Sequence, residues 1–372
     1  MKEIGFWDYT CPTHGSLEHY TTDEWDRLLD DMAAGGFNSL VLGIKWLTTG
    51  YRSRLPWLDQ RADNAAIATD NATIHHALAG ARQRGIRPRL LVVSTQFQTP
   101  EFGPQFPTIG NWGDVGHYDV DQPGVTERIL ALFGEVVDLF GQEIDGIVVE
   151  MEFCDAEGPH RVASYNRWAA ANNRPDFETI KKILLEPRSY PFFDWRDYAT
   201  QRRIDTLREI EKTVRAGGCN AELSSLVELA NGDGVCVSNV NLPVLRDAFP
   251  QWPLVTYDSV YDRRVNRLAA MDFCIHQPRK LGLQAYYLTR GVMTWTWPPD
   301  ATWDTTLQEQ WRMSLEDAAA HNPDVLWFMG SDARSDGLVC SNKKLAHWGY
   351  HDGIVARRAL MEMAKQMGVR VR

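Results

Sequence analysis

The stretch GVTERILALFGEVVDLFGQEIDGIVVEMEF, residues 124–153, joins a helical pattern directly to a strand pattern. Its first part repeats apolar residues three and four positions apart, which is the period of a helix with one buried face. Its second part, residues 144–153, is an apolar, partly β-branched run that ends with Glu150 and Glu152. A helix that leads into a buried strand is the repeating unit of a parallel sheet with crossover helices.

Strand patterns of this kind recur along the whole chain, with helical segments between them. The predicted strands are residues 3–9, 37–46, 87–95, 144–153, 219–229, 253–261, 283–293 and 324–332. Among the predicted helices, residues 21–36 carry a capping box of Thr21 and Glu24 and end at Gly35 and Gly36. Residues 352–368 show the same helical period.

Eight strand and helix units without a linker predict a single-domain (β/α)8 TIM barrel over residues 1–372. A doubly wound open sheet is the alternative, but neither GxGxxG nor GxxxxGK follows any predicted strand. The connection after the fourth strand, residues 154–217, is unusually long. We expect helices there, and with them additional substrate-binding structure.

Composition excludes several classes of function. A formal net charge of -10 and a pI near 5.5 do not suit a nucleic-acid surface, which needs clustered basic residues. No run approaches the roughly 18 apolar residues of a membrane span. The first residues lack the apolar segment of a signal peptide, so we expect a cytoplasmic protein unless such a peptide has been removed. The six cysteines form no CxxC pair, which favours reduced thiols.

The chain also contains 14 tryptophans, many of them beside polar residues. Such rings suit stacking on the faces of sugars, although packing in the core would account for about half of them.

Glu150 and Glu152 are the first candidates for catalysis. Side chains alternate along a strand, so both carboxylates point the same way and Met151 points the other way. At the C-terminal end of a barrel strand the shared direction is the central cavity, where catalytic groups of TIM barrels lie. Burial of two acids raises the pKa of one of them and makes it a general acid. The alternative is that basic residues at the rim neutralise both.

The segment DGIVVEME, residues 145–152, resembles the strand-four signature DGxDxDxE of the chitinase-type glycoside hydrolases. The resemblance implies that Glu152 protonates the glycosidic oxygen and that Glu150 stands at the position of the Asp that orients the substrate acetamido group. Val148 replaces the first Asp of the signature, and Glu150 is one methylene longer than Asp. Two shorter segments also resemble that family, VTYDS with its strand-six Tyr257 and Asp258, and GVMTW with a Trp of the sugar site.

A second carboxylate is expected from another strand end. Asp258 follows an apolar run and is the preferred partner, although it is equally suited to cap the next helix. Strand five offers Glu222 and Glu228, of which Glu228 suits a substrate contact or a loop anchor. Carboxylates about 5 Å apart indicate a retaining mechanism and a wider gap an inverting one. We expect retention.

Further polar and aromatic residues at the predicted strand ends form the expected sugar-binding pocket. The substrate-binding candidates are Trp7, Asp8, Lys45, Trp46, Gln96, Glu228, Tyr257, Arg290 and Trp295. Each of them taken alone suits a structural ion pair or a packing contact equally well. Lys45 is the most informative, because a cation at the mouth pairs with a carboxylate or binds the substrate.

Three functions fit this pattern. The first is a glycoside hydrolase that needs no cofactor or metal and uses Glu150, Glu152 and Asp258. The second is a metal-dependent sugar isomerase or epimerase, with Glu152, Asp258 and His14 around a divalent cation. The third is a catalytically inactive carbohydrate-binding barrel. His75 and His76 are adjacent on a predicted helix and face different directions, so we expect surface positions for them and not metal ligation, and no HExxH motif occurs. The oligomeric state is left open.

Overall fold

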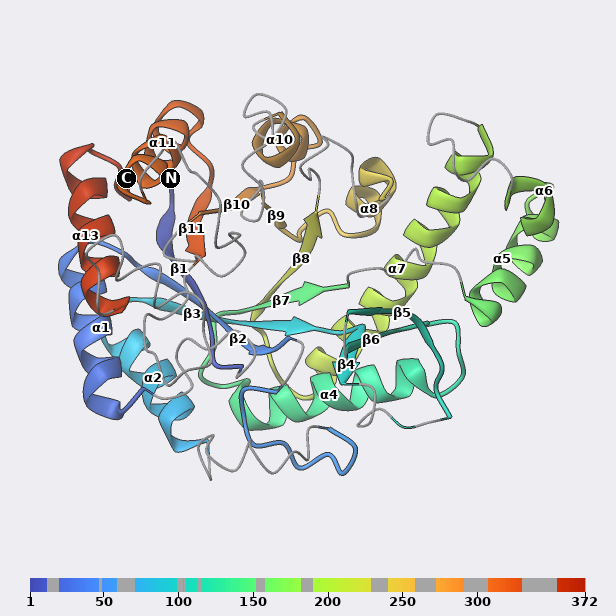
Figure 1. The fold of residues 1–372 in the computed structure, drawn as a ribbon, viewed down its shortest axis with the longest axis horizontal. Helices are drawn as coiled ribbons and strands as arrows, with labels where there is room; N and C mark the ends of the chain where they lie inside the picture. The colour runs from blue at the N-terminus through green and yellow to red at the C-terminus, as the bar shows by residue number, and fades with distance from the viewer. Residues whose placement is uncertain are drawn as a thin grey trace.

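The computed structural model describes residues 1–11, 20–46, 49–58, 71–98, 103, 105–112, 115–151, 158–181, 190–228, 240–257, 272–290, 307–329 and 353–371. Its centre is a closed barrel in which each strand pairs in parallel with its neighbours, in the order β1-β11-β10-β9-β8-β7-β3-β2 (Figure 1). The barrel strands are β1 (Glu3–Tyr9), β2 (Ser39–Lys45), β3 (Arg87–Val93), β7 (Gly146–Glu150), β8 (Glu222–Glu228), β9 (Leu254–Tyr257), β10 (Ala285–Arg290) and β11 (Val325–Met329).

Helices surround the barrel and connect its strands (Figure 1). They are α1 (Thr22–Ala34), α2 (Ala72–Gln83), α4 (Val125–Phe140), α5 (Pro159–Ala171), α6 (Phe177–Lys181), α7 (Tyr190–Ala216), α8 (Leu242–Ala248), α10 (Gln277–Lys280), α11 (Leu307–His321) and α13 (Gly353–Gln366), with the π-helical turn η2 (Asp272–His276) before α10. The TIM-barrel prediction is therefore confirmed. The capping box of Thr21 and Glu24 is present at α1, and Gly35 caps its C-terminal end.

Each predicted strand coincides with a barrel strand. In addition, a separate three-stranded antiparallel sheet of β4 (Gln96–Gln98), β6 (Val115–Tyr118) and β5 (Thr108–Trp112) follows β3. Its strands are three to five residues long, polar or glycine-containing, and too short to show a period. Within the described residues, no helix is long and apolar enough to span a membrane.

Alternation along the strands divides the apolar core into two layers. Residues such as Val148 and Leu91 belong to an inner cluster inside the barrel. Ile147, Val149 and Leu90 belong to an outer cluster between the strands and the helices. Because neighbouring residues of a strand join different clusters, the cluster to which a residue belongs gives the direction of its side chain.

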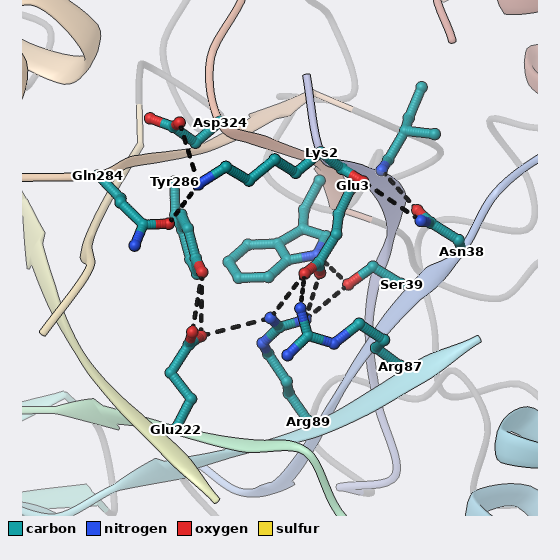
Figure 2. A network of polar contacts seen from close by, with 12 residues as sticks. Lys2, Glu3, Asn38, Ser39, Arg87, Arg89, Glu222, Gln284, Tyr286 and Asp324 are labelled. Atoms are coloured by element: carbon teal, nitrogen blue, oxygen red, sulfur yellow. Dashed lines mark hydrogen bonds and ion pairs between the residues drawn. The ribbon is translucent and has the colours of Figure 1, made fainter. Parts of the chain in front are cut away.

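A polar layer closes the N-terminal end of the barrel interior (Figure 2). Arg89 is fully buried, and its Nη2 lies 3.0 Å from Glu3 Oε1 and 3.3 Å from Glu222 Oε1. Its Nη1 lies 3.0 Å from Ser39 Oγ, and Tyr286 donates its hydroxyl to Glu222 at 3.1 Å. The guanidinium of Arg89 therefore joins carboxylates of β1 and β8 across the barrel interior.

Charge pairing in this layer outweighs the cost of burial. Burial alone would raise the pKa of Glu3, but the hydrogen bond and positive charge of Arg89 more than offset it, so the pKa of Glu3 is lowered. Burial would likewise lower the pKa of Arg89, and the contact with Glu3 raises it instead. Arg87 also pairs with Glu3, but 45% of its side chain is exposed.

The Glu3 and Arg89 pair should contribute strongly to the free energy of unfolding. Glu3→Gln leaves the buried guanidinium of Arg89 without its main counter-charge, and we expect a loss of about 3 to 5 kcal/mol at pH 7 by urea denaturation. Arg87→Gln is the control, because removing the exposed partner should cost about 1 kcal/mol or less. Equal losses in the two variants would contradict the role given to Arg89.

Candidate active site

Glu150 is the last residue of β7 and points into the barrel. Val148 belongs to the inner cluster, and Met151 belongs to the outer one. In the strand register Glu150 lies between Val93 of β3 and Leu226 of β8, both members of the inner cluster. Only 7% of Glu150 is exposed. This carboxylate therefore lies inside the C-terminal end of the barrel, which is the catalytic end in TIM-barrel enzymes.

Several other predicted site residues fall outside the described part of the chain. These are Glu152, Asp258 and Trp295. Glu228 ends β8 and Arg290 ends β10, and their side chains also lie outside the described part. Tyr257 ends β9, belongs to the inner cluster and pairs in register with Glu228. The ends of β7, β8 and β9 thus stand side by side around the mouth.

Aromatic residues form the opposite part of the mouth. Trp46 is 7% exposed and lies 5.8 Å from Tyr9, measured between ring centroids. Tyr9 packs on Gly43, where a Cβ atom would come within 2.3 Å of the Tyr9 ring. Trp46 therefore lies in the layer near the mouth. Tyr9 shares that layer but was not among the predicted candidates. It lies two residues after Trp7 in β1, so alternation along the strand points both side chains inward.

Trp7 lies deeper than its predicted role in sugar binding requires. It is fully buried, it donates its indole N–H to Tyr9 at 3.0 Å, and its ring centroid lies 5.7 Å from that of Trp327. The contacts are those of a packing residue beneath Tyr9. Most other described tryptophans are buried as well, namely Trp25, Trp195, Trp252, Trp311 and Trp327. For these the packing interpretation holds, and we leave Trp7 out of the proposed site.

Asp8 points away from the barrel interior. Its carboxylate lies 2.6 Å from Nη2 of Arg357 on α13, and both side chains are fully buried. This ion pair joins β1 to a surrounding helix, as the alternation along β1 requires. We therefore leave Asp8 out of the proposed site.

Lys45 binds main-chain carbonyls at the mouth. It lies at an irregularity in the pairing of β2 with β3 and is 1% exposed. Its Nζ donates to the carbonyl of Gln96 at 2.7 Å and to the carbonyl of Trp46, and it lies 4.4 Å from the centroid of the Phe97 ring. Lys45 thus ties the end of β2 to β4.

Gln96 and His117 face each other across β4 and β6. They are directly paired in the antiparallel register, so both side chains point to the same face of the small sheet. Phe97 and Tyr118 occupy the other face and belong to the outer cluster. Gln96 is fully buried and His117 is 2% exposed. His117 is therefore buried, on a strand, β6, that is too short to recognise in the sequence.

Two contacts anchor the first part of the connection after β7. Nη2 of Arg203, on α7, donates to the carbonyl of Met151 at 2.7 Å. At the start of α5, Asp119 accepts the backbone N–H of Arg161 at 2.9 Å, while Gly158 has no capping side chain of its own. Sequence patterns did not identify Asp119 or Arg203, because both contacts join residues far apart in the chain.

The chain is similar to known proteins in structure and not in sequence. Neither a family model nor a curated protein matches the sequence. The chain is similar in structure to the β-galactosidase from Rahnella sp. R3, with a TM-score of 0.65, 14% identity, and coverage of 100% of this chain and 56% of that one. The glycoside hydrolase domain of PgaB (BpsB) from Bordetella bronchiseptica has a TM-score of 0.62 at 13% identity, with 97% and 99% covered.

The catalytic domain of a β-amylase from Paenibacillus polymyxa has a TM-score of 0.55 at 8% identity, with 99% and 97% covered. At these identities the likeness shows the fold. This chain spans little more than half of the β-galactosidase chain, and it matches the other two over nearly their whole length.

The strand count bears on the chitinase-type resemblance. Residues 291–295, GVMTW, follow β10, which is the seventh barrel strand in chain order. The corresponding family segment belongs to the final strand. The position of GVMTW in the barrel therefore differs from that of the family segment.

Burial makes His117 a source of acid sensitivity. It lowers the pKa of His117 from 6.5 to about 4, so between these values the unfolded chain binds a proton that the folded protein does not. The contribution of His117 to the free energy of unfolding therefore keeps its full value above pH 6.5 and decreases as pH falls toward 4. Over this interval the free energy of unfolding of the native protein should fall by up to about 3 kcal/mol more than that of His117→Gln. Urea denaturation at stepped pH measures the difference, and parallel curves would contradict it.

Proposed function

We propose that this protein is a glycoside hydrolase that cleaves an oligosaccharide or a glycoside with carboxylate general acid and base catalysis. The observation that carries the proposal is the inward carboxylate of Glu150 at the catalytic end of a closed barrel. Similarity over nearly the whole chain to glycoside hydrolase structures supports the same class of reaction.

In the proposed mechanism Glu152 donates a proton to the glycosidic oxygen. Glu152 lies two positions after Glu150 in the sequence, the spacing at which side chains of an extended chain are expected to point the same way. A second carboxylate, Glu150 or Asp258, stabilises the developing positive charge of the sugar. Tyr257 and Trp46, at the ends of β9 and β2, suit contacts with the sugar, because one offers a hydroxyl and the other an aromatic face.

We propose retention of the anomeric configuration, through a covalent intermediate formed on the second carboxylate. Retention requires the carboxylate to attack the anomeric carbon as the leaving oxygen takes the proton from Glu152. Water then attacks the same carbon, Glu152 accepts its proton, and the bond between that carbon and the enzyme carboxylate breaks. NMR observation of the first product formed distinguishes the mechanisms, because an inverted anomer would exclude the covalent route.

The catalytic assignment is tested by amide substitution. Glu152→Gln and Glu150→Gln should each lower kcat on nitrophenyl glycosides by at least about two orders of magnitude, because the amide neither donates a proton nor carries charge. Glu127→Gln, on the exposed surface of α4, is the matched control and should leave kcat unchanged.

A screen of wild-type protein against aryl glycosides and plant and microbial oligosaccharides identifies the substrate for this test. Glycans that bind without being cleaved would favour an inactive carbohydrate-binding barrel. Activity lost in EDTA and restored by Mn²⁺ would favour a metal-dependent isomerase. Wild-type kcat in Glu152→Gln would contradict the assignment of the acid.

A further inference from the structure

Two consecutive main-chain carbonyls at the end of β7 accept hydrogen bonds from two separate parts of the chain. The carbonyl of Glu150 accepts the backbone N–H of Ser94 at 2.9 Å and its hydroxyl at 2.8 Å. The next carbonyl, that of Met151, lies beyond the last described pairing of β7 with β8 and accepts from Arg203. The two contacts fix the two peptide groups that follow the Glu150 side chain, and with them the direction of that side chain.

Arg203 reaches this position from a helix that is itself firmly attached. Arg203 is 2% exposed and lies in α7, which packs against α4. Five residues before Arg203, Tyr198 donates its hydroxyl to Asp121 at 2.9 Å. Arg202, next to Arg203, places its Nε 2.5 Å from the same carboxylate. Figure 1 shows α7 beyond the end of β7.

We propose that Arg203 is a positioning residue of the active site, whose guanidinium holds the end of β7 and thereby directs the Glu150 carboxylate toward the substrate. The inference rests on the proposed function and deepens it, because it gives the long connection after β7 a role in catalysis. Neighbouring strands support β7 as far as Glu150, whereas the carbonyl of Met151 is held by α7, a helix inserted before β8. A guanidinium suits the task because it donates to a carbonyl in fixed geometry and keeps its charge at all relevant pH values.

Arg215 provides a matched control. It lies on the same helix and its Nη1 also donates to main-chain carbonyls, those of Cys219 at 2.9 Å and Ala221 at 2.8 Å. These carbonyls precede β8, at the opposite end of the barrel from Glu150. Arg203→Met and Arg215→Met therefore remove the same side chain and the same kind of contact. They differ in distance from the site and in burial, since Arg203 is buried and Arg215 is exposed.

With a substrate that the wild-type protein cleaves, Arg203→Met should lower kcat by at least about tenfold, with KM changed less than about threefold, since small misplacements of a catalytic group mainly affect the reacting geometry. Arg203→Lys keeps a donor and should recover part of the loss. Arg215→Met should retain wild-type kcat. Equal kcat in the Arg203→Met and Arg215→Met proteins would overturn the proposal.

A second readout is independent of turnover. Selective ¹³C labelling of glutamate carboxyl groups, with Glu150→Gln to assign the signal, follows the titration of Glu150 by NMR. Its midpoint should move in Arg203→Met and stay unchanged in Arg215→Met. An unchanged midpoint in both would overturn the inference. A wild-type protein that cleaves no glycoside but shows the Arg203-dependent shift would refute the proposed function alone.

Discussion

A closed barrel has an enclosed interior, and every second side chain of its strands must enter it. Most of these side chains are apolar, but acidic residues point inward at both ends of the barrel. At the N-terminal end Glu3 is neutralised by Arg89, whose guanidinium is the centre of a buried network. At the C-terminal end Glu150 occupies the place where barrels perform chemistry. Among the described residues, the same constraint therefore produces two structural acids, Glu3 and Glu222, and a candidate catalytic acid, Glu150.

Alternation explains which parts of the structure could be predicted from sequence. The strands are short apolar runs separated by helices, so their order and number follow from the pattern, and the direction of Glu150 follows from its parity with Val148. The same rule separates Trp7 from Asp8, because adjacent residues cannot both face the interior. Residue type alone did not separate them, and it suggested a sugar contact for both.

Contacts between distant residues could not be predicted. Asp8 forms an ion pair with Arg357, which lies near the other end of the sequence. The carbonyl of Met151 accepts a hydrogen bond from Arg203 in the long helix α7. The buried position of His117 depends on a three-stranded sheet whose strands carry no periodic signal. In each case tertiary packing decides the role of a polar side chain, and its local sequence resembles that of an ordinary surface residue.

The central claim is that carbohydrate is cleaved beside Glu150, at the C-terminal ends of the barrel strands. A crystal structure of the Glu152→Gln variant with the glycoside that the wild-type protein cleaves tests it most directly. The account predicts the scissile sugar inside the mouth, with the Glu150 carboxylate within hydrogen-bond or van der Waals distance of the ring at its anomeric end. A sugar bound elsewhere on the molecule, with Glu150 in contact only with protein atoms, would contradict it.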